Sequence, residues 1–201
     1  MSYRFIFLLF FPFFLYSETD FRDISISEYK NLLSKTKNTK QLYRDYLLNA
    51  RLSDKEINSI ISFYGPNELY RSYIYSRSAN WRGVPIFVKD NIDTKNLATT
   101  AGSKALLDNL PKDDAQIIKN LKKAGFVIAG KTNLSEWANF RASSSTSGWS
   151  SVGGQTYNPY NLKYNPCGSS SGSAAIVAEG IAPASIGTET NGSIVCPASI
   201  N

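Results

Sequence analysis

The chain has 201 residues, of which 42% are hydrophobic and 13% aromatic. This length and composition suffice for one domain with a hydrophobic core, and they exclude a disordered chain as the default interpretation. The net charge of +6 comes from lysines and arginines scattered over residues 30–165 without a run of five or more. That distribution argues against a nucleic-acid partner.

The first 17 residues have the layout of a secretory signal peptide. Arg4 precedes an apolar stretch over residues 5–15, and small Ser17 is followed by acidic and polar sequence. Pro12 interrupts the stretch, which is shorter than the roughly 20 residues that cross a hydrocarbon core, so no stable membrane span is expected. We predict an exported protein, periplasmic or secreted, with anchoring by an uncleaved leader as the alternative.

Residues 18–80 are predicted to form an N-terminal helical segment. Leucine, isoleucine and tyrosine recur at spacings of three and four between positions 24 and 62, a period typical of amphipathic helices. Ser53 followed three residues later by Glu56 has the form of a capping box, which would open a second helix there. The segment is expected to be a small helical layer that packs on the rest of the chain.

The pattern changes near residue 82, and residues 81–201 are predicted to form part of an α/β domain. Residues 83–88 are an apolar run rich in branched side chains, consistent with a buried strand that ends at Lys89. A helix is expected over residues 113–124, stopped by Gly125, and a second buried strand over residues 126–130. This order indicates a mixed, mostly parallel sheet with covering helices.

Residues 142–173 are rich in serine, glycine, asparagine and proline and have almost no apolar periodicity. A linker is one interpretation. The stretch leads directly into a compact small-residue helix over residues 173–182 and a short strand over residues 183–187. Because a long loop inside a compact domain usually has a function, we predict a functional loop.

The two cysteines, Cys167 and Cys196, are too few to staple a small disulfide-rich protein. A disulfide between them depends on a distance that the sequence does not contain. We expect two buried free thiols, with an oxidised pair as the alternative in an exported protein.

The chain contains no histidine. A Ser-His-Asp or Cys-His arrangement therefore cannot be built from it, and a zinc site would lack its usual nitrogen ligands. A serine nucleophile would need another base, and a lysine held as the neutral amine is the common substitute.

Lys89 is the candidate base. It ends the apolar run of residues 86–88 and is followed by Asp90, Asn91 and Asp93, and the ends of strands are where α/β sheets place chemistry. Burial and hydrogen bonding can lower the pKa of a lysine from about 10.4 to about 7–8. The alternative is an exposed lysine at a strand end, paired with Asp90 or Asp93.

Two serine-containing segments could complete such a site. Residues 168–173, GSSSGS, lead into a helix but lack the GK[ST] ending of a phosphate loop and the glycine pattern of a dinucleotide site. Their clustered hydroxyls could relay protons, or could belong to an ordinary capped loop. In residues 187–199 a strand breaks into a tight turn before a helix near Ser193, where backbone N–H groups could stabilise an oxyanion.

Three segments in this order resemble the amidase signature family, most closely its peptide amidase branch: residues 83–93 (GVPIFVKDNID), 167–180 (CGSSSGSAAIVAEG) and 187–199 (GTETNGSIVCPAS). The resemblance covers roughly residues 82–201, and nothing before residue 80 adds to it. It implies an incomplete amidase signature fold and hydrolysis of carboxylic or peptide C-terminal amides through a serine acyl-enzyme. The implied partner is a small-molecule or peptide amide substrate, and no metal or organic cofactor is implied.

The resemblance also implies a role for each matching residue. Ser193 would attack the amide carbonyl, Ser169 would bridge the proton relay and carry a cis peptide bond to its neighbour, and Lys89 would be the final base. Ser170 and Ser171 are rival candidates for the bridging serine. The oxyanion hole and its support would comprise the backbone N–H groups of Thr190, Asn191, Gly192 and Ser193, with Thr188 and Glu189 shaping the turn and Gly168 and Ser170 supporting the site.

Two departures from the family pattern leave alternatives open. Asn191 stands where many members have glycine or aspartate, which concerns substrate contacts because only its backbone is needed in the hole. Family members continue for hundreds of residues beyond the position that matches Asn201. The alternatives to an active amidase are a truncated, non-catalytic remnant or interaction fragment of such an enzyme and, within the family, an amidotransferase subunit-like protein.

Overall fold

The computed structural model describes residues 19–140 and 142–201. The predicted signal peptide over residues 1–17 lies outside these described residues, so it stays a prediction. Within the described ranges, no helix is both long enough and apolar enough to cross a membrane.

Helices and short strands alternate along the chain. The helices are α1 (Ile26–Lys35), α2 (Thr39–Ile57), α3 (Pro66–Ser76), α4 (Gln116–Ala124), α5 (Ser171–Ala178) and α6 (Val195–Ile200). The strands are β1 (Ile60–Phe63), β2 (Pro85–Lys89), β3 (Val127–Thr132), β4 (Trp149–Ser150), β5 (Gly154–Gln155) and β6 (Ser185–Ile186). Two 3-10 turns, Lys104–Leu106 and Glu136–Asn139, lie in the connecting segments.

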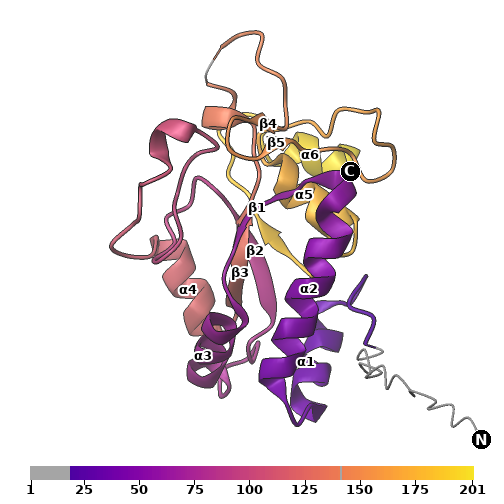
Figure 1. Ribbon diagram of the computed structural model, residues 1–201, viewed down its shortest axis with the longest axis vertical. Helices are drawn as coiled ribbons and strands as arrows, with labels where there is room; N and C mark the ends of the chain where they lie inside the picture. The colour runs from indigo at the N-terminus through magenta and orange to yellow at the C-terminus, as the bar shows by residue number, and fades with distance from the viewer. Residues whose placement is uncertain (1–18, 141) are drawn as a thin grey trace, which may run out of the picture.

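Four strands form the central sheet, in the order β1-β3-β2-β6 (Figure 1). β2 pairs in parallel with β3 and with β6, whereas β1 pairs antiparallel with β3. β4 and β5 form a separate antiparallel ladder. The predicted mixed, mostly parallel sheet is therefore confirmed, and α4 is the crossover helix that the parallel pairing of β2 and β3 requires.

Helices cover both faces of the sheet and bury alternate residues of β2. On one face Phe87 joins a core cluster with residues of α1, α2 and α5. On the other face Ile86 and Val88 pack with Ile118 of α4, and Figure 1 shows α1 and α2 on the opposite side of the sheet from α4. Because every residue of β2 is buried, Lys89 at its end is carried into the interior with the apolar residues before it.

The N-terminal segment, predicted to be helical throughout, contains one strand of the sheet. α1 and α2 supply the predicted helical layer, but β1 pairs antiparallel with β3. α2 ends because Asn58 adopts a left-handed conformation with φ 50°. The carboxylate of Asp54 then accepts the N–H groups of Ser59 and Ile60 as the chain turns into the strand.

The predicted capping box at Ser53 and Glu56 is wrong, because both residues lie inside α2, a single helix of 19 residues. A capping box occurs instead at the start of α1. There the Ser25 hydroxyl accepts the N–H of Glu28, and the Glu28 carboxylate accepts the N–H of Ser25. The same serine–glutamate spacing occurs inside helices, so the spacing alone does not locate a helix end.

The elements predicted after residue 80 are found close to their expected positions. β2 ends at Lys89, and β3 begins at Val127. α4 begins at Gln116 rather than at residue 113, and it stops at Gly125, whose φ of 107° is left-handed. The sequence-based order of strand, helix and strand is therefore confirmed.

We expect Leu47→Ala to lower the free energy of unfolding by about 2–5 kcal/mol, because Leu47 is 1% exposed in the core. The neighbouring Leu48 is 40% exposed, so Leu48→Ala is a matched control that should cost less than about 1 kcal/mol. Urea unfolding followed by circular dichroism would measure both variants. Equal losses in the two would contradict the packing of α2 against the core.

Candidate active site

Three segments that lie far apart in the sequence meet at the carboxyl end of β2. They are the residues that follow Lys89, the serine segment that opens α5, and the turn between β6 and α6. They border an open cavity of about 690 Å³ whose lining includes Asn91, Ser169, Thr188, Glu189, Thr190, Asn191 and Ser193. In the described part of the chain, no group of three or more acidic or cysteine side chains is arranged to hold a metal ion.

Lys89 has no exposed surface. Its Nζ donates to Ser169 Oγ at 2.7 Å and to the backbone carbonyl of Thr188 at 3.2 Å. Burial lowers the pKa of Lys89 to about 8, because the charged form loses its hydration. The site therefore holds a lysine that is partly neutral at mildly alkaline pH and that contacts a serine hydroxyl.

The alternative of an exposed Lys89 paired with Asp90 or Asp93 is wrong. Lys89 is buried, and the salt bridges found among the described residues do not include it. The carboxylate of Asp90 instead faces the ammonium of Lys131 at 3.5 Å.

Ser169 is the residue of the serine segment that contacts Lys89. The peptide bond between Gly168 and Ser169 is cis, at the position where the resemblance implies one. Ser169 is fully buried, yet it also borders the cavity. Its hydroxyl therefore lies between the buried amine and the open space.

The two rival serines have other partners. Ser170 Oγ donates to the carbonyl of Thr188 at 3.1 Å and accepts the N–H of Thr188 at 3.2 Å. Ser171 Oγ donates to the carbonyl of Cys167. Ser170 thus ties the serine segment to the turn after β6, and Ser171 holds the loop that precedes α5.

Ser193 lies in the turn before α6 and lines the same cavity as Ser169. The N–H of Ser170 donates to the carbonyl of Ser193 at 3.0 Å, so the two segments are joined through their backbones. Of the three predicted catalytic side chains, those of Lys89 and Ser169 are in direct contact. Ser193 lines the same cavity as Ser169, but among the described residues its hydroxyl has no hydrogen bond to Ser169.

Glu189 shapes the turn over residues 187–193, as expected. Its carboxylate accepts the N–H groups of Gly192 at 3.0 Å, Ile194 at 2.6 Å and Val195 at 2.8 Å. These bonds, led by that from Val195, lower the pKa of Glu189. The N–H of Gly192, one of four predicted for the oxyanion hole, is therefore engaged with Glu189 here, while the other three residues line the cavity.

Residues 138–140 also line the cavity and are not predicted from the sequence. Ala138 and Asn139 have positive φ, and Phe140 is 96% exposed. No local pattern marks these residues as part of a site. Asn91, which the sequence marks only as a polar neighbour of Lys89, lines the cavity and donates to Thr188 Oγ1 at 2.9 Å.

The expectation of two free thiols is wrong, since Cys167 and Cys196 form a disulfide. Their Cα atoms lie 5.9 Å apart, a separation that a disulfide spans. Cys167 precedes Ser169 in the same loop, and Cys196 follows Ser193 in α6. The bond therefore joins the loop that contains Ser169 to the helix that follows Ser193.

Comparison with known proteins finds relatives of two kinds, amidases and amidotransferase subunits. A family model described as Amidase matches residues 41–201, so the likeness begins well before residue 80, contrary to the expectation from the motifs. A probable amidase of Arabidopsis thaliana is 54% identical over 120 residues, which are 59% of this chain and 23% of that protein. A glutamyl-tRNA(Gln) amidotransferase subunit of Lactobacillus acidophilus is 41% identical over 172 residues, 86% of this chain and 35% of that protein.

Among solved structures, the native peptide amidase of Stenotrophomonas maltophilia matches with a TM-score of 0.79 and 41% sequence identity. The match covers 93% of this chain and 39% of that chain. The chain therefore spans less than two fifths of the length of each of these three relatives. The likeness confirms the α/β fold expected from the motifs.

Removing the disulfide should lower the free energy of unfolding by about 2–4 kcal/mol, because it joins residues separated by 29 positions and restricts the unfolded chain. Cys167→Ser combined with Cys196→Ser should show this loss without further sensitivity to reductant. Thiol titration of the denatured protein and thermal unfolding with and without reductant would measure the bond and its effect. Two reactive thiols before reduction would contradict the disulfide.

Lys89→Met should raise the free energy of unfolding at pH 7 by about 2–3 kcal/mol, because it removes a buried amine whose charged form is disfavoured. The pKa of Lys89 is about 8 in the folded chain and about 10.4 in an unfolded one. Between these values the unfolded state binds more protons, so the wild type gains stability as pH rises and the advantage of the variant shrinks.

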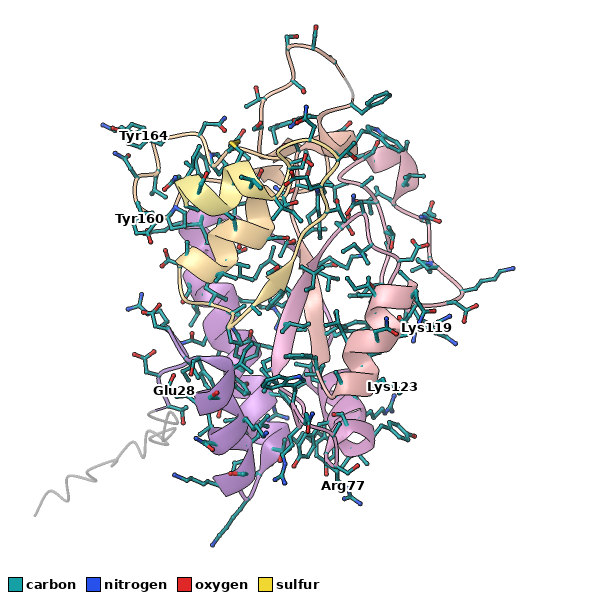
Figure 2. The ribbon with its side chains drawn as sticks, turned by 180° about the vertical axis from the view of Figure 1, so that it is seen from behind. Glu28, Arg77, Lys119, Lys123, Tyr160 and Tyr164 are labelled. Atoms are coloured by element: carbon teal, nitrogen blue, oxygen red, sulfur yellow. A yellow bond between two sulfur atoms is a disulfide. The ribbon has the colours of Figure 1, made fainter. Side chains whose placement is uncertain are left out.

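Urea unfolding of both proteins at pH 7 and pH 10 would test this linkage. Lys119→Met is the matched control, because Lys119 is an exposed lysine on α4 (Figure 2). The control should match the wild type at both pH values. A stability difference between wild type and Lys89→Met that stays constant with pH would contradict the burial of the amine.

Proposed function

The chain belongs to the amidase signature family, and on this basis we propose that it hydrolyses amides through a serine acyl-enzyme. Ser193 is the proposed nucleophile, Ser169 the bridging residue and Lys89 the base. The proposed substrates are carboxylic amides or the C-terminal amides of peptides.

The contact between Lys89 and Ser169 carries the proposal. The amine is buried, lies 2.7 Å from the Ser169 hydroxyl and has a pKa lowered to about 8 by burial. A structural lysine at this depth is expected to pair with a carboxylate, as Lys131 does with Asp90. Lys89 instead faces a hydroxyl that leads toward the cavity, which suits a base that exchanges a proton.

In the first half of the proposed reaction, Ser193 Oγ attacks the carbonyl carbon of the amide. Its proton passes to Ser169 Oγ, while the hydroxyl proton of Ser169 passes to the neutral amine of Lys89. The reverse transfers deliver a proton to the leaving nitrogen as the C–N bond breaks. The products of this half are an ester on Ser193 and a free amine or ammonia.

In the second half, water attacks the ester with the help of the same relay, and the carboxylic acid leaves. The negative charge that forms on the carbonyl oxygen in both halves needs donors, each of which is typically worth about 2.7–4 kcal/mol. Thr190, Asn191 and Ser193 line the cavity, and their backbone N–H groups are the proposed donors. The carboxylate of Glu189 holds the turn that contains these residues in place, because it accepts the N–H groups of Ile194 and Val195.

We further propose that peptide amides are the substrates and that the protein is exported. The likeness to a peptide amidase over 93% of the chain supports peptide amides as substrates. Export is supported by the signal-peptide pattern of residues 1–17 and by the disulfide, since structural disulfides persist mainly in oxidising compartments.

A second candidate function lies within the same family. The identity of 41% over 86% of the chain to a glutamyl-tRNA(Gln) amidotransferase subunit favours a role in which the amide nitrogen is transferred. The proposed relay would then release ammonia for transfer to a further acceptor. The amide that is hydrolysed fastest would distinguish the two functions.

Ser193→Ala and Lys89→Met should each lower kcat/KM for amide hydrolysis by at least about 10³-fold, because each removes a member of the relay. Wild-type activity should rise with pH through about 8, as Lys89 loses its proton. Ammonia release from simple amides, peptide C-terminal amides and glutamine would measure both effects. Dominant release from glutamine would favour the second candidate.

Ser199→Ala is a matched control, because Ser199 is an exposed serine of α6 close in sequence to Ser193. It should keep the wild-type rates. Equal rates in the wild type and the two relay variants would refute the assignment of the relay. A folded wild-type chain that turns over none of these amides would identify a non-catalytic remnant.

A further inference from the structure

A second lysine, Lys131 of β3, is as deeply buried as Lys89 and has no part in the proposed relay. Its Nζ donates to the carbonyl of Ile92 at 2.7 Å and to Thr99 Oγ1 at 3.1 Å. It also lies 3.5 Å from Oδ1 of Asp90. Burying an ion pair is costly, so a pair retained beside a candidate active site calls for an explanation.

A bulge in the sheet decides which way Lys131 faces. Along β2 and β3 the pairing passes from Ile86↔Ile128 to Phe87↔Gly130, which leaves Ala129 as an extra residue on β3. After the bulge Val88 pairs with Lys131, and Lys89 pairs with Thr132. Because paired residues share a face, Lys131 lies on the same face as Val88 and Asp90, opposite to Lys89.

The negative charge of the buried Asp90 carboxylate is balanced by the ammonium of Lys131. Oδ2 accepts the N–H of Thr100 at 3.1 Å and the hydroxyl of Thr100. Oδ1 is buried and, among the described residues, has no hydrogen bond; it faces the Lys131 ammonium. Burial raises the pKa of Asp90 and lowers the pKa of Lys131, and each charge opposes the shift of the other.

Three other charged residues, Asp93, Lys89 and Glu189, bear on the Asp90–Lys131 pair. Asp93 acts on Lys131 from the loop after β2 and favours its charged form. On the opposite face, Lys89 is met by the hydroxyl of Ser169 and the carbonyl of Thr188, and Glu189 is exposed in the neighbouring turn with its carboxylate bound to backbone N–H groups. Asp90, the residue directly after Lys89, therefore carries a buried negative charge that Lys131 can balance.

We propose that Lys131 is a positioning residue for the base: by neutralising Asp90 it keeps an unbalanced negative charge away from Lys89 and so favours the uncharged form of Lys89. The inference deepens the proposed function and rests on Lys89 as its base. It accounts for two buried lysines on opposite faces of the sheet, one next to a hydroxyl and one next to the carboxylate that follows the proposed base.

The test is a titration of Lys89 by NMR of its 13Cε signal in the whole chain, assigned by comparison with Lys89→Met. In Lys131→Met the unbalanced Asp90 carboxylate should move the midpoint of Lys89 to higher pH by about one unit. In Asp90→Asn the unbalanced Lys131 ammonium should move it to lower pH by a similar amount. An electrostatic role of Lys131 predicts shifts of the Lys89 midpoint in opposite directions in the two variants. A general disturbance of the fold would not reverse the direction of the shift with the sign of the charge that is removed.

Two controls complete the design. The double variant Asp90→Asn/Lys131→Met removes both charges and should return the midpoint to the wild-type value. Lys122→Met breaks the ion pair of Lys122 with Asp114 near α4, where the two charges lie 2.6 Å apart, and should leave the midpoint unchanged. The inference is overturned if Lys89 titrates as in the wild type in either single variant, or if both shift in the same direction.

The titration needs no substrate, so its result is separate from that of the amide assays. If Ser193→Ala and Lys89→Met leave turnover unchanged while the two midpoints move apart, the proposed function fails and the electrostatic coupling stands. If both relay variants are inactive while the midpoints stay fixed, the proposed function stands and the role of Lys131 fails.

Discussion

The arrangement of the site depends on one amine that has lost its water and faces a hydroxyl instead of a carboxylate. Lys89 is fully buried, and Ser169 is its side-chain partner at 2.7 Å. A carboxylate at that distance would stabilise the ammonium and raise its pKa, so that less of the proposed base would be neutral at mildly alkaline pH. The fold must therefore bury a lysine and at the same time keep acidic side chains off the face of the sheet on which it lies.

Close packing of α5 against the sheet satisfies the first part of this requirement. The N–H of Gly172 donates to the carbonyl of Asn133 at 3.0 Å. A Cβ on Gly172 would lie 2.3 Å from the carbonyl oxygen of Ser59 and 2.6 Å from that of Asn133. Only glycine lets the first turn of the helix come this near to β1 and to the end of β3. The serine segment just before that turn is thereby brought over the end of β2, within reach of Lys89.

The sequence predicts those parts of this arrangement that local patterns determine. The strand that ends at Lys89 and the helix that stops at Gly125 follow from apolar runs and a helix terminator, and the motifs indicate the serine segments. β1 was missed because its isoleucines also fit a helical period, and its pairing with β3 is a contact between distant residues. The disulfide and the bulge at Ala129 depend on three-dimensional distances and pairing, so neither the oxidised cysteines nor the direction of Lys131 could be predicted.

The residues that line the cavity differ widely in burial. Lys89 and Ser169 are fully buried, and the strand, the helix start and hydrogen bonds fix their positions. Phe140, which also lines the cavity, is 96% exposed and follows a segment in which Ala138 and Asn139 have positive φ. Proton transfer needs fixed distances, whereas recognition of a substrate needs accessible side chains. The proposed base and the exposed residues of the cavity therefore lie on separate elements, and changes at residues 138–140 need not disturb the burial of Lys89.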